Sequence, residues 1–289
     1  MRIGIVILPD ERWSVASRRW RLAEEYGFDH AWTYDHLGWR DLVDGPWFDA
    51  VPTLTAAATV TRRIGLGTYV ASPNFRHPVH FTREVTALDD ISQGRLILGV
   101  GAGGIGFDSA VLGAAGLTPR QRVDRFAEFL DLLDRLLRED RTDFAGAYYT
   151  AVDARSTPGP VQRPRPPFVV AANGPRSMRI AARWGQGWVT TGKGGDTVEE
   201  WWAGVGELAK RFGDLPGSDG LDRYLSLDSA PVFSLSSVDY FREAAGRAAE
   251  LGFTDVIAHW PREDGVYAGR VSTLERIVST VLPELRAAR

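Results

Sequence analysis

The residues best suited to chemistry stand in the stretch TYDHLGWRD at 33–41, which follows a short apolar-leaning run. Asp35, His36 and Trp39 lie within five positions there, in a chain that has only five histidines. An imidazole exchanges a proton near neutral pH, and an indole offers a flat face to a planar ligand. A single histidine is more often structural than catalytic, but a position where a strand is expected to end favours catalysis.

Short apolar runs alternate with amphipathic stretches along the chain, which is typical of parallel strands joined by helices. Eight strand–helix units in 289 residues predict an α/β fold, a (β/α)8 TIM barrel. No linker or shift in composition divides the chain, so a single domain over 1–289 is expected. The eight expected strands are 2–8, 30–34, 64–70, 95–100, 168–172, 187–191, 224–233 and 255–260.

Polar residues and glycines follow several of these runs, where a barrel of this kind places its catalytic surface. Glu11 offers a further carboxylate, and most of the ten tryptophans are expected in the core. Trp13, Trp39 and Trp260 are exceptions, because they fall at expected loop ends where a planar ligand could stack. The candidates are Asp10, Glu11, Asp35, His36, Trp39, Ser72, Asn74, Gly101 to Gly104, His259 and Trp260.

Local signals mark two helix starts and one insertion. Residues 118–121 predict a capping box with a proline at the first helical position, and 196–199 resemble a second box. The segment 141–167 breaks the alternation and is rich in proline and glycine. We expect it to be an insertion between the fourth and fifth strands, with a short hairpin around Gly146.

Composition excludes several classes of function. Lys plus Arg total 34 and Asp plus Glu 37, so a net charge of -3 gives no general attraction to nucleic acid or anionic lipid, and neither partner is expected. The absence of cysteine excludes disulfides and thiolate chemistry, and His77 and His80 lack an acid at ligand spacing, so no metal site is expected. No apolar run reaches the roughly 18 to 20 residues of a membrane span, so the protein is expected to be cytoplasmic.

Two turn motifs admit more than one interpretation. Residues 99–104, GVGAGG, satisfy G-x-G-x-x-G after a strand, but the second strand and acid of a dinucleotide-binding unit do not follow promptly. We interpret these glycines as letting a flat ligand approach the backbone. In 171–176, AANGPR, a strand ends and a helix begins at Pro175, so free N–H groups and Arg176 suit a phosphate. An ordinary strand–helix turn fits that spacing equally well.

Three blocks resemble the luciferase-like flavin- and deazaflavin-dependent oxidoreductases, which share the bacterial luciferase barrel. LGTYVASPNFRHPVHFTREVTALDDISQGRLILGVGAG at 66–103 is similar to the family's third strand, third helix and fourth strand. TYDH at 33–36 and VVAANGPRSMRIAARWGQGWVT at 169–190 match further blocks. An Asp-His pair followed by a nearby tryptophan resembles the branch that uses coenzyme F420, a deazaflavin.

The resemblance implies a role for each matched residue. Asp35 and His36 would lie at the deazaflavin ring near its hydride-carrying carbon, with Trp39 on the substrate side. A cis peptide bond between Tyr69 and Val70 would press on the central ring. We therefore expect His36, Asp35 and Glu11 to be catalytic and Trp13, Trp39, Gly104 and Trp260 to contact substrate. The cofactor ring would contact Asp35, His36, Tyr69, Val70, Ala71, Ala102 and Gly103, and its tail phosphate Ala171, Ala172, Asn173, Gly174, Pro175 and Arg176.

The expected activity is hydride transfer between reduced F420 and a small organic substrate, with His36 as a proton donor or ring-orienting group. Gly104 stands where similar sugar-phosphate dehydrogenases carry a glutamate, which argues against a sugar phosphate. One alternative is an FMN-dependent monooxygenase that uses reduced flavin and O2, and another is a non-catalytic flavin-binding or assembly subunit. The resemblance also implies a homodimer.

Overall fold

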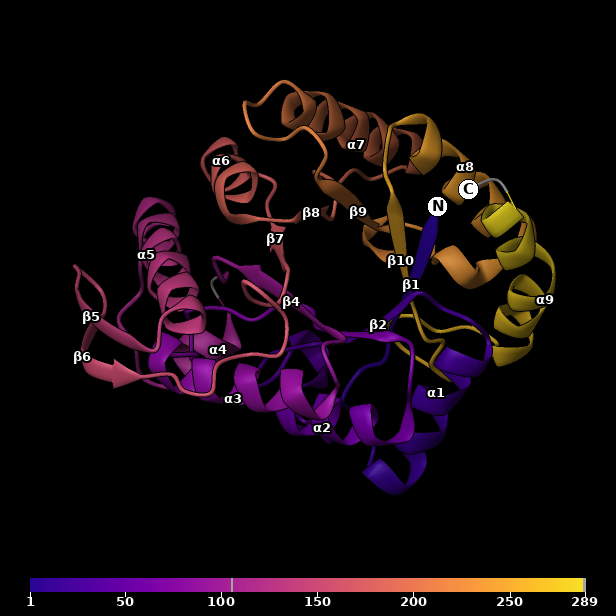
Figure 1. The fold of residues 1–289 in the computed structure, drawn as a ribbon. Helices are drawn as coiled ribbons and strands as arrows, with labels where there is room; N and C mark the ends of the chain where they lie inside the picture. The colour runs from indigo at the N-terminus through magenta and orange to yellow at the C-terminus, as the bar shows by residue number, and fades with distance from the viewer. Residues whose placement is uncertain (105, 288–289) are drawn as a thin grey trace. The chain divides into compact units, whose positions relative to one another are not determined.

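The computed structural model describes residues 1–104 and 106–287 (Figure 1). Eight parallel strands form a closed barrel in the order β1-β10-β9-β8-β7-β4-β3-β2, which confirms the predicted TIM barrel. The barrel strands are almost wholly buried because they are covered on both faces, as parallel strands require. They are β1 (Arg2–Val6), β2 (His30–Thr33), β3 (Gly65–Thr68), β4 (Leu96–Gly101), β7 (Phe168–Ala171), β8 (Gly187–Thr190), β9 (Asp222–Ser226) and β10 (Asp255–His259).

Helices follow the barrel strands, and none in the described part of the chain is both long and apolar enough to cross a bilayer. In the longer helices apolar residues recur at helical spacing, so that one face of each of them is buried. The α-helices are α1 (Trp13–Glu25), α2 (Ala50–Val60), α3 (Pro78–Ile91), α4 (Phe107–Ala110), α5 (Pro119–Arg138), α6 (Pro175–Trp184), α7 (Val198–Gly213), α8 (Val238–Glu250) and α9 (Val271–Ala287). Three 3-10 turns are η1 (Arg40–Leu42), η2 (Leu227–Ser229) and η3 (Ser234–Ser236).

The predicted helix caps are right in one case and displaced in the other. Thr118 and Gln121 form the expected capping box at the start of α5. The cap of α7 lies one residue later than 196–199, because the Thr197 hydroxyl accepts from the Glu200 N–H. The Glu200 carboxylate in turn accepts from the N–H groups of Asp196 and Thr197.

The expected strand 224–233 is wrong in its second half. The strand β9 ends at Ser226, and the chain continues through η2 and η3. The physical reason is Asp228, whose carboxylate accepts from the backbone N–H groups of Ser234 at 2.7 Å and His259 at 2.6 Å. These bonds fold the segment back on itself, which an extended strand could not do.

The insertion contains the expected hairpin, formed by the antiparallel strands β5 (Arg141–Ala145) and β6 (Thr150–Arg155) beside α5 (Figure 1). Glu128 on α5 shapes its turn, because its carboxylate accepts from the N–H groups of Ala147, Tyr148 and Tyr149. A Cβ at Gly146 would lie 2.1 Å from a Glu128 oxygen, so a side chain there would displace the carboxylate that holds the turn.

Backbone contacts divide the described residues into two compact units. The terminal unit comprises 1–8, 19–32 and 169–289, and the central unit comprises 9–18 and 33–168. The single domain expected from the sequence stays a prediction. The candidate residues of each unit are therefore described separately.

Candidate functional site

Asp35, in the central unit, is a buried carboxylate held by one guanidinium. Its side chain is 1 % exposed, and its oxygens accept from Arg76 Nη2 at 2.6 Å and Nε at 3.1 Å. Arg76 also pairs with Asp49 and Glu84, at 3.0 Å each. Burial raises the pKa of Asp35 above its ordinary value, and Arg76 opposes that shift. Three carboxylates thus share the Arg76 cation, and one of them, Asp35, directly precedes His36 in the chain.

His36 is held from one side by a carboxylate that the sequence prediction did not include. Its Nδ1 lies 2.5 Å from Asp108 Oδ2, and Asp108 Oδ1 accepts from the Leu37 N–H at 2.8 Å. The His36 side chain is 28 % exposed and that of Asp108 only 7 %. The Nε2 of His36 has no hydrogen-bond partner among the described residues, so one ring nitrogen is held and the other is open to a ligand.

Aromatic rings surround the loop that carries His36. The Tyr34 ring meets those of His36 at 5.8 Å and Trp39 at 5.0 Å, both edge to face, and stacks with Tyr69 at 6.0 Å. Trp47 donates its indole N–H to the His36 carbonyl at 2.7 Å. Rings packed in this way fix the loop backbone and leave the partly exposed Trp39 at its edge.

The loops after β3 and β4 carry the bare backbone that a flat ligand needs. The Tyr69–Val70 peptide bond is cis, as predicted. Ala71 joins the end of β4, because its N–H donates to Gly99 O and its carbonyl accepts from the Gly101 N–H. Gly103 has a φ of +72°, and a Cβ there would lie 2.7 Å from Asn74, so glycine is required.

The position of Gly104 is different, because a Cβ there would meet no atom of the described residues within 4 Å. The Gly104 carbonyl accepts from Asn74 Nδ2 at 3.0 Å, which places the backbone without filling the space above it. Space therefore does not exclude the glutamate of similar dehydrogenases, and this chain simply lacks a side chain at that point.

Glu11 and Trp13 lie at the start of the central unit, both half-buried, with Trp13 as the first residue of α1. Among the described residues, no hydrogen bond joins Glu11 to His36, whose carboxylate partner is Asp108. Asp108 is the one acidic residue between Gly101 and Thr118. An acid in a loop after a barrel strand was a signal that could have found it.

In the terminal unit, Ala171 to Arg176 form the expected turn from β7 into α6. Trp188 donates to Ala172 O at 2.7 Å, and Asn173 Nδ2 donates to Thr191 Oγ1 at 2.8 Å. The helix begins at Pro175, as predicted, and no side chain caps its first turn. Exposed backbone N–H groups beside Arg176 suit an anion. Phosphate binding by these residues stays a prediction.

His259 and Trp260, also in the terminal unit, are packed rather than open. His259 is 1 % exposed, its Nδ1 lies 2.9 Å from Asp228 Oδ2, and the Tyr267 ring stacks on it at 3.7 Å. Trp260 is 5 % exposed and stacks with Tyr26 at 6.2 Å. The indole of Trp260 therefore already has a packing partner, and the substrate contact expected of it stays a prediction.

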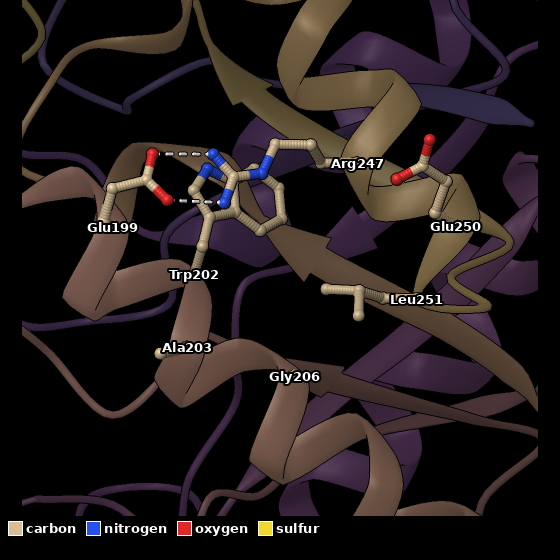
Figure 2. Close-up of a pocket in the computed structure, with 7 residues that line it drawn as sticks. All are labelled: Glu199, Trp202, Ala203, Gly206, Arg247, Glu250 and Leu251. Atoms are coloured by element: carbon tan, nitrogen blue, oxygen red, sulfur yellow. Dashed lines mark hydrogen bonds and ion pairs between the residues drawn. The ribbon is translucent and has the colours of Figure 1, made fainter.

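Two further features of the described residues have structural explanations. His77 caps α3, because its Nδ1 accepts from the Val79 N–H at 3.3 Å, and no group of three or more acids and histidines is placed to hold a metal. A groove of about 420 Å³ lies on the outer helices α7 and α8 (Figure 2). Its cation, Arg247, stacks on Trp202 and pairs with Glu199.

A family model for luciferase-like monooxygenases matches residues 1–227. The chain belongs to the luciferase-like monooxygenase family. A luciferase-like relative, the F420-dependent glucose-6-phosphate dehydrogenase of Beutenbergia cavernae, is 30 % identical over 318 aligned positions, covering 92 % of this chain and 91 % of the relative. The enzyme of that name from Amycolatopsis mediterranei is 38 % identical over 176 residues, 60 % of this chain, and the match spans only about half of it, 52 %.

Solved structures share the luciferase-like barrel. Monooxygenase RslO1 from Streptomyces bottropensis superposes with a TM-score of 0.80 at 21 % identity, covering 99 % of this chain and 100 % of that one. The coenzyme F420-dependent tetrahydromethanopterin reductase of Methanopyrus kandleri gives 0.73 at 18 % identity, covering 98 % and 99 %. At such identities the likeness shows the fold alone. The family match over residues 1–227 is what shows that the protein is a luciferase-like oxidoreductase.

Proposed function

We propose that this protein transfers a hydride between coenzyme F420 and a small organic substrate whose reacting group is a hydroxyl or a carbonyl. The observation that supports this most strongly is His36, an imidazole with one nitrogen held by Asp108 and the other open. Interconversion of an alcohol and a carbonyl moves a proton at oxygen as well as a hydride at carbon, and histidine suits the proton. The F420-dependent name of the relative from Beutenbergia cavernae supports the cofactor.

The residues of the central unit fit a flat ring. Ala71, Ala102 and Gly103, in the loops after β3 and β4, have small or absent side chains, and Gly103 has no Cβ to hold a ligand away from its backbone. When bound, F420 would supply the carbon that gives or takes the hydride. His36 would exchange the proton at Nε2, while Asp35, fixed by Arg76, would hold the loop backbone at the ring.

The substrate is expected to carry an apolar part and no sugar phosphate. Leu37, next to His36, is 37 % exposed, and Phe107, next to Asp108 in α4, is 41 % exposed. Phe107 packs on Gly38, where a Cβ would lie 2.9 Å from its ring. These apolar side chains favour a hydrophobic group beside the reacting carbon.

Binding of F420 against FMN is the experiment that tests this function. Each cofactor is titrated into the purified protein, and fluorescence quenching gives its Kd. F420 should bind in the low micromolar range and FMN more weakly. Tighter binding of FMN, with oxygen uptake in the presence of reduced FMN, would instead support the monooxygenase alternative.

Activity assays of the F420-bound protein test the non-catalytic alternative. Protein that binds F420 yet leaves it unchanged across a panel of alcohols and ketones would contradict the proposed activity. The homodimer implied by the resemblance is likewise part of the proposal, and light scattering of the purified protein tests it.

A further inference from the structure

We propose that Asp108 is a positioning residue that holds His36 in the tautomer protonated on Nδ1, so that the Nε2 lone pair faces the substrate. The first half of this proposal is a property of the protein alone. The second half, the use of Nε2 in turnover, rests on the proposed function.

The hydrogen bonds of Asp108 determine the tautomer. A carboxylate only accepts hydrogen bonds, so the nitrogen 2.5 Å from Asp108 Oδ2 must carry the proton. The other oxygen is already occupied by the Leu37 N–H at 2.8 Å. Both oxygens therefore accept from consecutive residues of one loop, which fixes the ring relative to its own backbone.

Contacts with neighbouring side chains restrict the orientation of the His36 imidazole. Tyr34 presents its ring to that of His36 at an interplanar angle of 75°, and Trp47 holds the His36 carbonyl. Phe107, next to Asp108 in α4, packs on Gly38. Asp35 is bound to Arg76 on both oxygens, so Asp108 is the carboxylate that reaches this ring among the described residues.

The proton balance of the reaction fits this arrangement. In the oxidative direction bound F420 would accept the hydrogen of the substrate C–H bond together with both electrons of that bond. The O–H bond breaks as well, its proton bonds to Nε2 of His36, and the C=O double bond forms. His36 is then a cation beside the nearly buried Asp108 carboxylate, which stabilises it. The reductive direction returns the same proton to the carbonyl oxygen.

Nitrogen-15 NMR of the histidine rings tests the tautomer directly. Protein labelled at histidine is recorded through a pH series, and H36Q identifies the His36 signals. In the neutral ring of the wild type, Nδ1 should carry the proton. In D108N the amide oxygen can only accept and its NH2 can only donate. If the oxygen keeps the Leu37 N–H bond, the NH2 faces Nδ1, so the ring proton should move to Nε2.

Two variants separate this effect from general damage. D108E keeps a carboxylate and should retain the Nδ1–H form, whereas D41N changes an exposed aspartate of the neighbouring 3-10 turn and should leave the His36 spectrum as it is. A wild-type ring protonated on Nε2 would overturn the proposal without any variant. An unchanged tautomer in folded D108N would also overturn it.

F420 titration and kinetics on the same proteins keep the two proposals distinguishable. A wild type that fails to bind F420 contradicts the proposed function and leaves the NMR result standing. With a substrate that the wild type oxidises, D108N should lower kcat about 100-fold with little change in KM. Equal kcat in D108N would show that the tautomer has no role in turnover.

Discussion

One histidine–aspartate pair from each unit, His30–Asp255 and His36–Asp108, shows how the same side chains take different roles. In the terminal unit His30 Nε2 lies 2.9 Å from Asp255 Oδ1, and the two side chains are 3 % and 0 % exposed. In the central unit His36 pairs with Asp108 at 2.5 Å, and these are 28 % and 7 % exposed. Both histidines come from the same stretch of chain, at the start of β2 and shortly after its end.

The difference lies in how many partners each ring has. His30 accepts from the Trp32 indole on Nδ1 at 2.6 Å, so both of its nitrogens are occupied. Asp255 also accepts from Arg2 and Thr254. His30 therefore has no ring nitrogen left for a ligand, whereas His36 keeps one. In barrels of this kind the amino ends of the strands contribute stability and the carboxyl ends contribute chemistry.

Removing each histidine gives the largest expected contrast. H36A should lower kcat by about 10²- to 10⁴-fold, because the proton-exchanging group is lost, while the Kd for F420 changes little. H30A should lower the unfolding midpoint in urea and leave kcat of the folded protein nearly unchanged. Equal kcat in H36A and the wild type would remove His36 from the mechanism.

Removing the Asp255 carboxylate from the His30–Asp255 pair should lower the stability of the protein and leave its kcat nearly unchanged. D255A leaves the buried His30 ring without its acceptor and Arg2 with Asp222 alone, and leaving a buried polar group unpaired costs about 1 to 3 kcal/mol. Urea unfolding measures this change. D108A, which loses a carboxylate beside a partly exposed ring, should cost less, and a larger loss in D108A than in D255A would contradict the comparison.

Local pattern was enough to predict the barrel, the start of α6 and the hairpin, because strand runs, capping residues and turn glycines are near neighbours in the chain. Within the candidate site, the sequence could predict only those residues that directly follow an expected strand or lie in a block that resembles the family. Asp108 and Asp228 were not predicted in their observed roles, since their partners His36 and His259 are 72 and 31 positions away. Such pairings depend on which loops the barrel brings together, which no local spacing encodes.

Two buried aspartates should respond to pH in opposite directions. Burial raises the pKa of Asp255, but bonds from His30 and Arg2 outweigh it and hold that pKa below the ordinary 3.8. Its contribution to stability is therefore present above pH 3.8 and lost as the pH falls through the lower folded value. Burial raises the pKa of Asp35, so its contribution is present below 3.8 and lost as the pH rises through the folded value.

The measurement is urea unfolding of D255N, D35N and the wild type from acid to neutral pH. The stability lost in D255N should be larger at neutral pH than in acid, and that lost in D35N should be larger in acid. D41N, at an exposed aspartate, serves as the control for a change of charge alone. Parallel pH curves for D255N and D35N would show that the two sites do not differ as described.

The smallest effect is expected at an ion pair that is open to water. Arg247 donates to both oxygens of Glu199 at 2.9 Å and lies over Trp202 in the groove of Figure 2. The Glu199 side chain is 76 % exposed, so water and salt screen its charge despite a bidentate geometry as good as that between Arg2 and Asp255.

Urea unfolding of E199Q, R247Q and the double mutant gives the coupling free energy between the two side chains. This coupling free energy should be close to the experimental error, and about 1 M NaCl should abolish it. A coupling as large as the loss in D255A, or one that survives high salt, would mean that burial does not decide what such a pair contributes. The difference in exposure between His30 and His36 would then no longer predict different roles. Only the open Nε2 of His36 would distinguish the two rings.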